Sequence, residues 1–472
     1  MDAAAAEEVA SGVLLGVRGY RSAGKNSSTA TSRTSTGHPI GVTFWNEPPP
    51  ALSYFSVHCP DLQLLPDNIF LAPKAIAADD GLLLLRVPVK HFGGKCSLND
   101  NDYFVYHLGP PAPSPKLDLL PWPHCLGDKE IAILGCGGDK DKHKHYVVAA
   151  LQIRNVFTST YTLHLYYSSS SCGGGGDEIA GSWTCQEVSV EEPVRDKLCP
   201  IPNSAQRQTY HRTTKVITLG GPNGTVGWVD LWRGILLCDL LDEMTPKKLR
   251  DMPLPLPAKA NWRKYLNGDE SFSRDITVSQ QKDSIKYVEM EIVSPRAVTT
   301  TIPSATPADP DSYLEWVRHR REPQPTQHHF TVHPGRWKLT TWSMPIPHYE
   351  LLHKLMLNGN NKDEKEAKGA SSSSSLSLGC LRMCYPALSC IDDVVYLLCN
   401  AACSGESRIR MGGVMVAFDL KNKELRGVAK LHTTKNTLSS IRCYLATAIS
   451  KHLDTTIDTR VDQAEEDAEA AE

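Results

Sequence analysis

The sequence predicts a mostly β protein, and three observations support this fold class. Short apolar runs bounded by Gly, Pro, Asn and Asp recur along the chain, as they do in strands joined by turns. The run Tyr161–Tyr166 alternates with a period of two, which is typical of a strand with one buried face. Strands do not alternate with helices, so a parallel nucleotide-binding sheet is not expected, and a sandwich, a barrel or a propeller remains.

The expected strands share short length, apolar content and flanking turn residues. In chain order they are Val13–Val17, Leu82–Val89, Tyr103–Leu108, Tyr146–Ile153, Tyr161–Tyr167, Trp183–Val190, Val216–Leu219, Gly227–Trp232, Ile235–Asp239, Ile285–Ile292, Lys338–Ser343, Val394–Cys399 and Val414–Leu420. Helical spacing of apolar residues occurs in Ser312–Arg321, Tyr349–Leu357 and Leu438–His452. Only the last of these segments is long, so we expect one short C-terminal helix.

A weak internal repeat favours a propeller over the other β architectures. Residues 103–123, 234–255 and 414–429 each place a strand, then a turn-rich spacer, then a Leu that leads into a closing piece. A β-propeller builds every blade from four antiparallel strands and tolerates insertions between them. With blades of roughly 40 to 50 residues, about six to eight blades are expected.

One β-propeller-like domain is expected over residues 13–453, between a disordered N-terminus at 1–12 and an acidic disordered tail at 454–472. Four stretches within the domain lack apolar periodicity and are rich in Gly, Ser, Pro or charged residues. We predict these stretches, at 135–144, 168–177, 295–327 and 358–375, to be disordered loop insertions.

Composition and charge exclude several classes of protein. The chain is 41% hydrophobic and 22% charged, which excludes a wholly disordered chain, a collagen and a coiled coil. Its net charge of -3 gives no general attraction to nucleic acid or to anionic lipid. No apolar run approaches the roughly 20 residues of a membrane span, and acids precede the first apolar piece, unlike a signal peptide. We expect a cytoplasmic or nuclear protein, with a plastid disfavoured, and neither a membrane nor a nucleic-acid partner.

Fourteen cysteines are too few for a disulfide scaffold in a chain of 472 residues, so we expect thiols in a reducing compartment. Five cysteines fall close together, at Cys380, Cys384, Cys390, Cys399 and Cys403. Their three-residue spacings differ from the two-residue knuckles that zinc prefers, and one of them ends an apolar strand. Buried core thiols are therefore predicted, with a metal site as the alternative.

One segment partly matches a phosphate-binding P-loop. The run from Gly19 to Lys25 has the required glycine and lysine spacing and follows a predicted strand. A P-loop then needs Ser or Thr after the lysine, and a helix whose first amides hold the phosphates. Here Asn26 follows instead, and a polar tract comes next, so nucleotide binding is not expected.

Motifs that would support catalysis are missing from the sequence. It contains no Gly-x-Ser-x-Gly elbow, no His-Glu-x-x-His, no kinase signature and no dinucleotide fingerprint. Scattered Ser, His and Asp residues define a catalytic triad only through their geometry. We therefore assign no catalytic residue, no cofactor and no metal ligand from the sequence.

The densest aromatic segment runs from Gly227 to Asp239 and is predicted to be a core hairpin. Alternation places Trp228 and Trp232 on one strand face, and a turn is expected near Arg233. The alternative is a stacking platform for a ligand, because Trp is also favoured on binding surfaces. As structural residues of this hairpin we expect Trp228, Asp230, Trp232, Gly234, Cys238 and Asp239.

The same hairpin resembles the signature of a plant family, expanded in grasses, called domain of unknown function 1618. The resemblance lies in Trp228–Asp239 followed by Leu249–Pro257. Other blocks similar to the family are Thr34–Gly37, Val42–Phe44, Ser53–Pro60, Asp79–Val87, Asp102–His107, Thr340–Pro345, Pro386–Ser389, Val394–Cys399 and Ala417–Lys423. These blocks cover nearly the whole chain.

The resemblance implies a β-rich architecture similar to the propeller-like domains that follow F-boxes in plant proteins. It implies no established activity, so no functional residue is carried over. The three-helix F-box module is not expected, because Val13–Arg21 has the pattern of a first strand. A role as a ubiquitin-ligase substrate adaptor is accordingly not predicted.

The function predicted from the sequence is a non-catalytic intracellular protein-interaction module. Repeated short strands and the missing catalytic motifs favour this role, with a protein partner whose identity the sequence does not give. The oligomeric state is not predicted. The alternative is a small-ligand-binding protein or an enzyme that uses the mouth of the propeller channel, where loops from several blades converge.

Overall fold

The structure is a computed structural model. The residues that it describes are 12–60, 72–89, 101–108, 114–121, 126–137, 145–156, 159–169, 181–191, 193–195, 201–202, 205, 210–242, 247–290, 329–332, 335–343, 381–401, 414–422, 424–431 and 444–447. The expected N-terminal and C-terminal disorder and the four insertions lie wholly or mostly outside these residues. The expected helices Ser312–Arg321 and Tyr349–Leu357 lie outside them as well.

The described residues are mostly β and form six four-stranded sheets and one two-stranded sheet. Sheets 1 to 3 are, in spatial order, β2 (Tyr20–Arg21), β5 (Tyr54–His58), β4 (Pro39–Trp45), β3 (Ala30–Arg33); β6 (Lys74–Asp79), β7 (Leu82–Pro88), β8 (Asn101–His107), β9 (Lys116–Leu120); and β10 (Ile131–Gly135), β11 (Tyr146–Asn155), β12 (Thr160–Tyr167), β13 (Trp183–Ser189).

Sheets 4 to 6 are β14 (Lys215–Gly220), β15 (Thr225–Asp230), β16 (Gly234–Asp239), β17 (Arg250–Pro253); β18 (Arg274–Val278), β19 (Ser284–Glu289), β21 (Gly335–Ser343), β20 (His329–Val332); and β22 (Leu381–Leu388), β23 (Val394–Ala401), β24 (Val414–Asp419), β25 (Glu424–Lys430). The two-stranded sheet pairs β1 (Val13–Gly16) with β26 (Tyr444–Thr447). Neighbouring strands are antiparallel except for two parallel pairs, β2 with β5 and β19 with β21. Each run that the sequence predicts to be a strand overlaps an observed strand, although the ends differ by a few residues in several cases.

Strand β7 shows why the middle strands are apolar along their whole length. Leu83 and Leu85 point into a hydrophobic cluster shared with sheet 1, whereas Leu82 and Leu84 point into a cluster shared with sheet 3. Because successive side chains of a strand point to opposite faces, a sheet covered on both faces needs apolar residues at every position. The run Leu82–Pro88 meets this need except at Arg86, whose guanidinium pairs with Asp128 at 2.9 Å.

Hydrophobic clusters lie between consecutive sheets throughout the described part of the chain. Sheets 1 to 6 are joined in chain order by clusters that include Phe44, Tyr103, Trp228, Ile276 and Phe418. A further cluster packs sheet 6 against Leu14 of β1, Tyr444 of β26 and Leu52, which precedes β5. Consecutive sheets therefore pack face to face from sheet 1 to sheet 6, and sheet 6 also packs against β1, β26 and Leu52.

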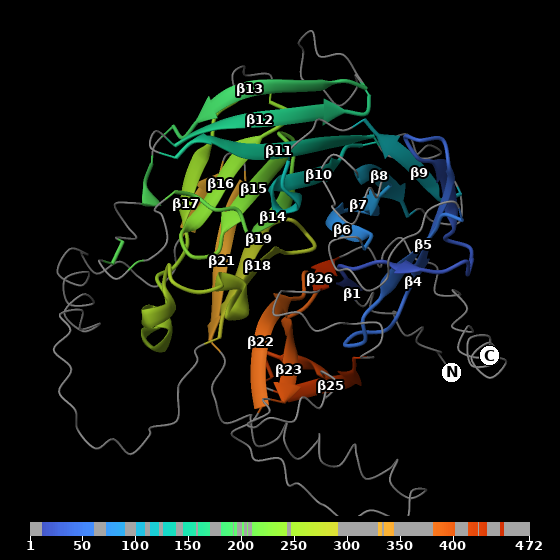
Figure 1. Cartoon of the computed structure of the whole chain (residues 1–472). Coiled ribbons are helices and arrows are strands. Elements are labelled where there is room, and N and C mark those ends of the chain that lie inside the picture. Colours follow the sequence, from blue (N-terminus) through green and yellow to red (C-terminus); the bar gives the residue numbers. More distant parts are fainter. Residues whose placement is uncertain are drawn as a thin grey trace, which may run out of the picture.

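The sheets follow one another around a common centre in chain order, from the blue strands of sheet 1 to the orange strands of sheet 6 (Figure 1). First strands lie next to first strands: β6 contacts β10, β10 contacts β14, β14 contacts β18, and β18 contacts β22. Near the same centre, β26 pairs with β1, which joins the two ends of the described chain. No helix in the described ranges is long and apolar enough to span a membrane.

The internal repeat detected in the sequence occupies equivalent places in the structure. Its three segments contain β8 with β9, β16 with β17, and β24 with β25. Each pair forms the third and fourth strands of its sheet, in sheets 2, 4 and 6 respectively. The repeat thus reflects one strand-turn-strand unit used three times.

The prediction of a short C-terminal helix over Leu438–His452 is wrong for the residues that the structure describes. Tyr444–Thr447 forms β26 and pairs antiparallel with all of β1. The apolar spacing of this segment is compatible with a helix, but the edge of β1 offers backbone partners, and the Tyr444 ring is fully buried against sheet 6. Tertiary pairing has overridden the local pattern.

Candidate functional site

The turns that join first and second strands gather at one end of the sheets. We call this surface the turn face and define it by residues 79–82, 220–225, 279–284 and 389–394, together with the β24–β25 turn. The turns contact one another through the backbone as well, since the amide of Gln280 donates to the carbonyl of Cys390 at 2.8 Å. The turn face is the candidate functional site of the described structure.

The carboxylate of Asp79, at the end of β6 in sheet 2, forms hydrogen bonds with residues of sheets 3 and 5. Its Oδ1 accepts a hydrogen bond from Nζ of Lys282 at 2.9 Å, and its Oδ2 accepts one from the amide of Gly135, also at 2.9 Å. Gly220 leaves room for the lysine, because a Cβ at that position would lie 3.1 Å from Nζ of Lys282. Burial raises the pKa of the Asp79 carboxyl above its usual value, while Lys282 acts in the opposite direction.

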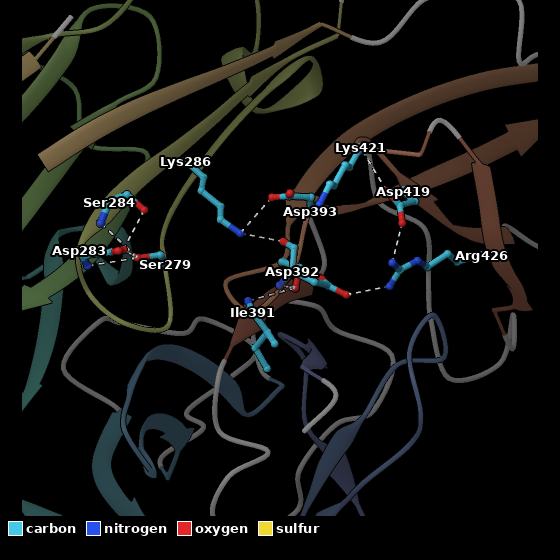
Figure 2. A network of polar contacts seen from close by, with 11 residues as sticks. Ser279, Asp283, Ser284, Lys286, Ile391, Asp392, Asp393, Asp419, Lys421 and Arg426 are labelled. Carbon is cyan, nitrogen blue, oxygen red and sulfur yellow. Dashed lines mark hydrogen bonds and ion pairs between the residues drawn. The ribbon is translucent and has the colours of Figure 1, made fainter. Parts of the chain in front are cut away.

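A second set of polar contacts connects sheet 5 to sheet 6 (Figure 2). Nζ of Lys286 donates to the carbonyl of Asp392 at 2.8 Å and lies 3.6 Å from Oδ1 of Asp393. From the other side, NH1 of Arg426 donates to Oδ2 of Asp392 at 3.1 Å, and NH2 pairs with Asp419. The β22–β23 turn is therefore held between cations from two different sheets.

Two serines fix the shapes of equivalent turns. Oγ of Ser279, directly after β18, accepts from the amides of Asp283 at 3.2 Å and Ser284 at 3.1 Å. Directly after β22, Oγ of Ser389 accepts from the amides of Ile391 and Asp392, both at 3.3 Å. Serine hydroxyls commonly hold turns in this manner. The turns are consequently ordered before any partner binds.

Asp419 closes the β24–β25 turn. Its Oδ1 accepts from the amides of Lys421 and Asn422, each at 2.9 Å, and its Oδ2 pairs with Arg426. Hydrogen bonds from the Asn422 backbone, followed by those from Arg426, hold the pKa of Asp419 below its usual value. The ionised carboxylate is thus the form that the fold favours.

This arrangement predicts a pH-dependent effect of Asp419→Asn. A carboxyl whose pKa is lowered in the folded state stabilises the fold above its unfolded-state pKa of 3.8 and loses that contribution as the pH falls through the folded value. We expect a lower urea midpoint than wild type at pH 7 and a difference that shrinks below pH 4. Lys421→Gln, which removes an exposed charge from the same turn, is the control. A difference that is equal at pH 7 and pH 3 contradicts the prediction.

The turn face carries exposed charges of both signs. Asp283, Lys421 and Arg426 are exposed, and Asp392 is partly exposed. Within the described ranges no group of three or more His, Cys, Asp or Glu residues is placed to hold a metal ion. The exposed side chains of the turn face can form ion pairs and hydrogen bonds, so this surface is suited to binding a partner with a charged surface.

The turn face is not among the sites predicted from the sequence. The signal that reveals it is a repeat: an apolar strand, a serine or aspartate, a short polar turn ending in an acid, and a second apolar strand. It occurs at 275–288 and 385–398. The pairing of Asp79 with Lys282 has no such signal, because 203 positions separate the two residues.

The predicted signature hairpin is formed by β15 and β16, and both of its tryptophans are buried. The Trp228 ring is fully enclosed between sheets 3 and 4, and its Nε1 donates to the carbonyl of Glu130 at 2.7 Å. Trp232 is 1% exposed and packs with Trp262 and Tyr265. The predicted shared strand face is wrong, because β15 ends at Asp230 and Trp232 lies in the turn, in a separate cluster.

The other hairpin residues also lie where the strands meet. Asp230 is fully buried and accepts from the amides of Arg212 at 2.9 Å and Trp232 at 3.1 Å, which fixes the turn. Gly234 permits close approach of β17, since a Cβ there would lie 2.5 Å from the carbonyl oxygen of Met252. Cys238 is buried, and Asp239 accepts from Arg250 at 2.8 Å and from Thr225.

Described cysteines of the predicted cluster are buried thiols. Cys384, Cys390 and Cys399 are nearly inaccessible, whereas Cys380 and Cys403 lie outside the described residues. Burial raises the pKa of Cys399 to about 12, so its thiol is protonated at neutral pH.

The segment that partly matches a P-loop does not continue as one. Asn26 accepts from the amide of Ser28 at 2.8 Å and donates to the carbonyl of Phe44 at 2.9 Å, which holds a tight turn. Strand β3 then begins at Ala30, where a P-loop would have a helix. The expectation that this segment is not a nucleotide-binding P-loop agrees with this geometry.

The architecture and its turn face define a mostly β protein built from repeated four-stranded sheets. Residues 228–396 match the sequence model of the family described as Protein of unknown function (DUF1618), and this match supports membership of that family. The match begins at Trp228 in β15 and ends at Tyr396 in β23, so it spans most of sheet 4, sheet 5 and the start of sheet 6. No curated protein and no solved structure matches the chain.

Proposed function

We propose that the protein is a six-bladed β-propeller that acts as a non-catalytic protein-interaction module, with the turn face as its binding surface. The observation that carries this proposal is the convergence of ordered, charged turns from sheets 2, 5 and 6 on one surface. Each four-stranded sheet corresponds to one blade.

Three features support the propeller. Hydrophobic clusters lie between consecutive sheets, including one that packs sheet 6 against β1 and Leu52. The first strand of one sheet contacts the first strand of the next, as expected around a central axis. Pairing of β1 with β26 joins the chain ends, which is how propellers commonly remove their open edge.

Two features support the turn face as an interaction surface. Its turns are held by internal ion pairs and serine hydrogen bonds, so a partner would lose little conformational entropy of the loops on binding. It also presents Lys421 and Asp283, charges of opposite sign that are exposed. Charge patterns of this kind set the specificity and the association rate of protein complexes.

The alternative is a small ligand or substrate at the mouth of the propeller channel. At the turn face, the ion pair between Lys282 and Asp79 joins blades 5 and 2, which lie opposite each other in a six-bladed ring. In such a propeller, the Lys282–Asp79 ion pair would lie across the mouth of the channel, where a small ligand would have to bind. The protein-interaction role is therefore the better supported of the two.

Affinity capture of protein partners by the full chain, followed by cross-linking of the complex, tests this proposal. We expect amine-reactive cross-links from a captured protein to concentrate on Lys282 and Lys421. The double variant Gln281→Trp/Lys421→Glu changes exposed turn tips and is expected to reduce capture at least tenfold without lowering the melting temperature. Arg154→Glu, at the opposite end of sheet 3, is the matched control and should capture normally. Equal capture by the wild type and the double variant would overturn the proposal.

A further inference from the structure

A groove of about 560 Å³ lies on sheet 1, and none of the residues that line it belongs to the turn face. It is lined by the polar face of β3, β4 and β5 and by the loop before β3. The lining residues are Gly24, Lys25, Thr29, Thr31, Ser32, Arg33, Pro39, Ile40, Gly41, Thr43, His58 and Pro60. This volume is within the range of roughly 300 to 1,000 Å³ that is usual for small-molecule sites.

Strand register explains why the sheet is hollow here. Thr31 pairs with Gly41, and Gly41 pairs with His58, so the three residues form one row across β3, β4 and β5. Because the middle residue of the row has no side chain, a space opens between the threonine and the histidine. The alternate residues of β4, Ile40 and Val42, are buried in the cluster between sheets 1 and 2. The hollow therefore lies on the face away from the core.

The charge of the groove has one sign. Lys25, Arg33 and His58 line it, and no Asp or Glu is among the described residues that line it. NH1 of Arg33 donates to the carbonyl of Gly37 at 2.9 Å, which anchors a guanidinium that has five N–H donors in total. Hydroxyls of Thr29, Thr31, Ser32 and Thr43 add further polar groups. Cations and hydroxyl donors together suit an oxyanion.

The loop that carries Lys25 is held in place by short contacts. The carbonyl of Gly24 accepts from Oγ1 of Thr43 at 3.2 Å, and the amide of Gly24 donates to Oγ of Ser22 at 3.1 Å. Directly after the lysine, the Asn26 side chain donates to the carbonyl of Phe44. The groove is therefore formed without a ligand, which reduces the entropy cost of binding.

We propose that this groove binds the phosphoryl group of a small phosphate monoester, with Lys25 and Arg33 as the charged donors and the hydroxyls of Thr31 and Ser32 as neutral donors. The Gly24-Lys25 pair of the P-loop-like segment thus has a phosphate-binding role without the P-loop structure. The site is independent of the turn face and of the proposed protein-interaction role. Gly41 sets its depth, because any larger residue would fill the row between Thr31 and His58.

Calorimetric titration of the full-length protein with glucose 6-phosphate, phenyl phosphate, inorganic phosphate, a phosphoserine peptide and unphosphorylated glucose tests this proposal. We expect at least one of the two monoesters to bind tenfold or more tightly than inorganic phosphate, and glucose not to bind. Equal affinity for inorganic phosphate would overturn the small-ester assignment in favour of a general anion site. Tighter binding of the peptide would overturn it in favour of a phosphoprotein.

Two variants test whether the monoester binds in the groove on sheet 1. Arg33→Gln removes one charge from an exposed position, and Gly41→Leu fills the groove; both are expected to raise the Kd for the monoester at least tenfold. The leucine should be tolerated, because the nearest atom to a Cβ at Gly41 is the Ala30 carbonyl oxygen at 3.8 Å. Arg154→Gln, an exposed arginine on sheet 3, is the charge-matched control and should leave the Kd unchanged. Unchanged affinity in both groove variants, with unchanged melting temperatures, would overturn the proposal.

Discussion

Replacing Trp232 by Ala is expected to lower the free energy of unfolding by about 3–5 kcal/mol, as for other buried aromatic residues. The indole is 1% exposed and contacts the Tyr265 ring edge-on, with the ring centroids 5.7 Å apart. The Arg274 guanidinium lies 4.8 Å from the centre of the Trp232 ring, and Nε1 donates to the carbonyl of Gly268 at 3.0 Å. Removing the ring leaves a cavity, loses this cation–π contact and loses the hydrogen bond to Gly268.

Thermal and urea unfolding of Trp232→Ala and Trp228→Ala measure this effect. Trp228 packs between sheets 3 and 4, so its loss is expected to cost a similar amount and to loosen that interface. Leu119→Ala is the control, because Leu119 is 37% exposed and substitutions at such sites usually change stability by less than about 0.5 kcal/mol. Tryptophan variants that melt like the control would show that the rings are not core residues, and would favour a ligand-stacking role for the hairpin.

The middle strands of the sheets are predictable from the sequence because both of their faces are buried. β7 reads Leu-Leu-Leu-Leu-Arg-Val-Pro, a run that no loop would carry. The first strand of the same sheet, β6, reads Lys-Ala-Ile-Ala-Ala-Asp and gives no such signal, although it lies beside β10 near the centre. Alanine fits there because first strands approach one another closely, and this close approach is a property of the assembled sheets.

The candidate sites differ in how far the sequence reveals them. The hairpin of Trp228 and Trp232 stands out because large aromatic residues are concentrated within a few positions. By contrast, the groove depends on Gly41 lying between Thr31 and His58, which only the register of three strands brings about. The link between Asp79 and Lys282 likewise depends on how sheets 2 and 5 are placed in the folded chain. Local patterns therefore predict the core more readily than the polar surfaces.

Arg274 and Glu289 form a buried ion pair that should be sensitive to the loss of either partner. NH2 of Arg274 lies 3.1 Å from Oε2 of Glu289, and the arginine side chain is fully enclosed. NH1 of the arginine donates to the carbonyl of Leu231 at 3.0 Å, while Oε1 of the glutamate accepts from Asn261 at 2.8 Å. The pair thus connects β18 and β19 to the turn that carries Trp232.

Arg274→Met is expected to cost about 3–5 kcal/mol, because it leaves the Glu289 charge buried without its cation. The double variant Arg274→Met/Glu289→Gln removes both charges, and its Gln oxygen can still accept from Asn261, so it should be less destabilised than Arg274→Met alone. The matched control is the exposed pair of Arg154 and Glu187, with side chains 61% and 54% exposed, for which Arg154→Met should cost about 1 kcal/mol or less. Urea unfolding of the wild type, Arg274→Met, Glu289→Gln and the double variant gives the coupling energy of the buried pair. If Arg274→Met is no less stable than Arg154→Met, the buried ion pair does not stabilise the junction of sheets 4 and 5. The contact between the Trp232 and Tyr265 rings must then stabilise this junction instead.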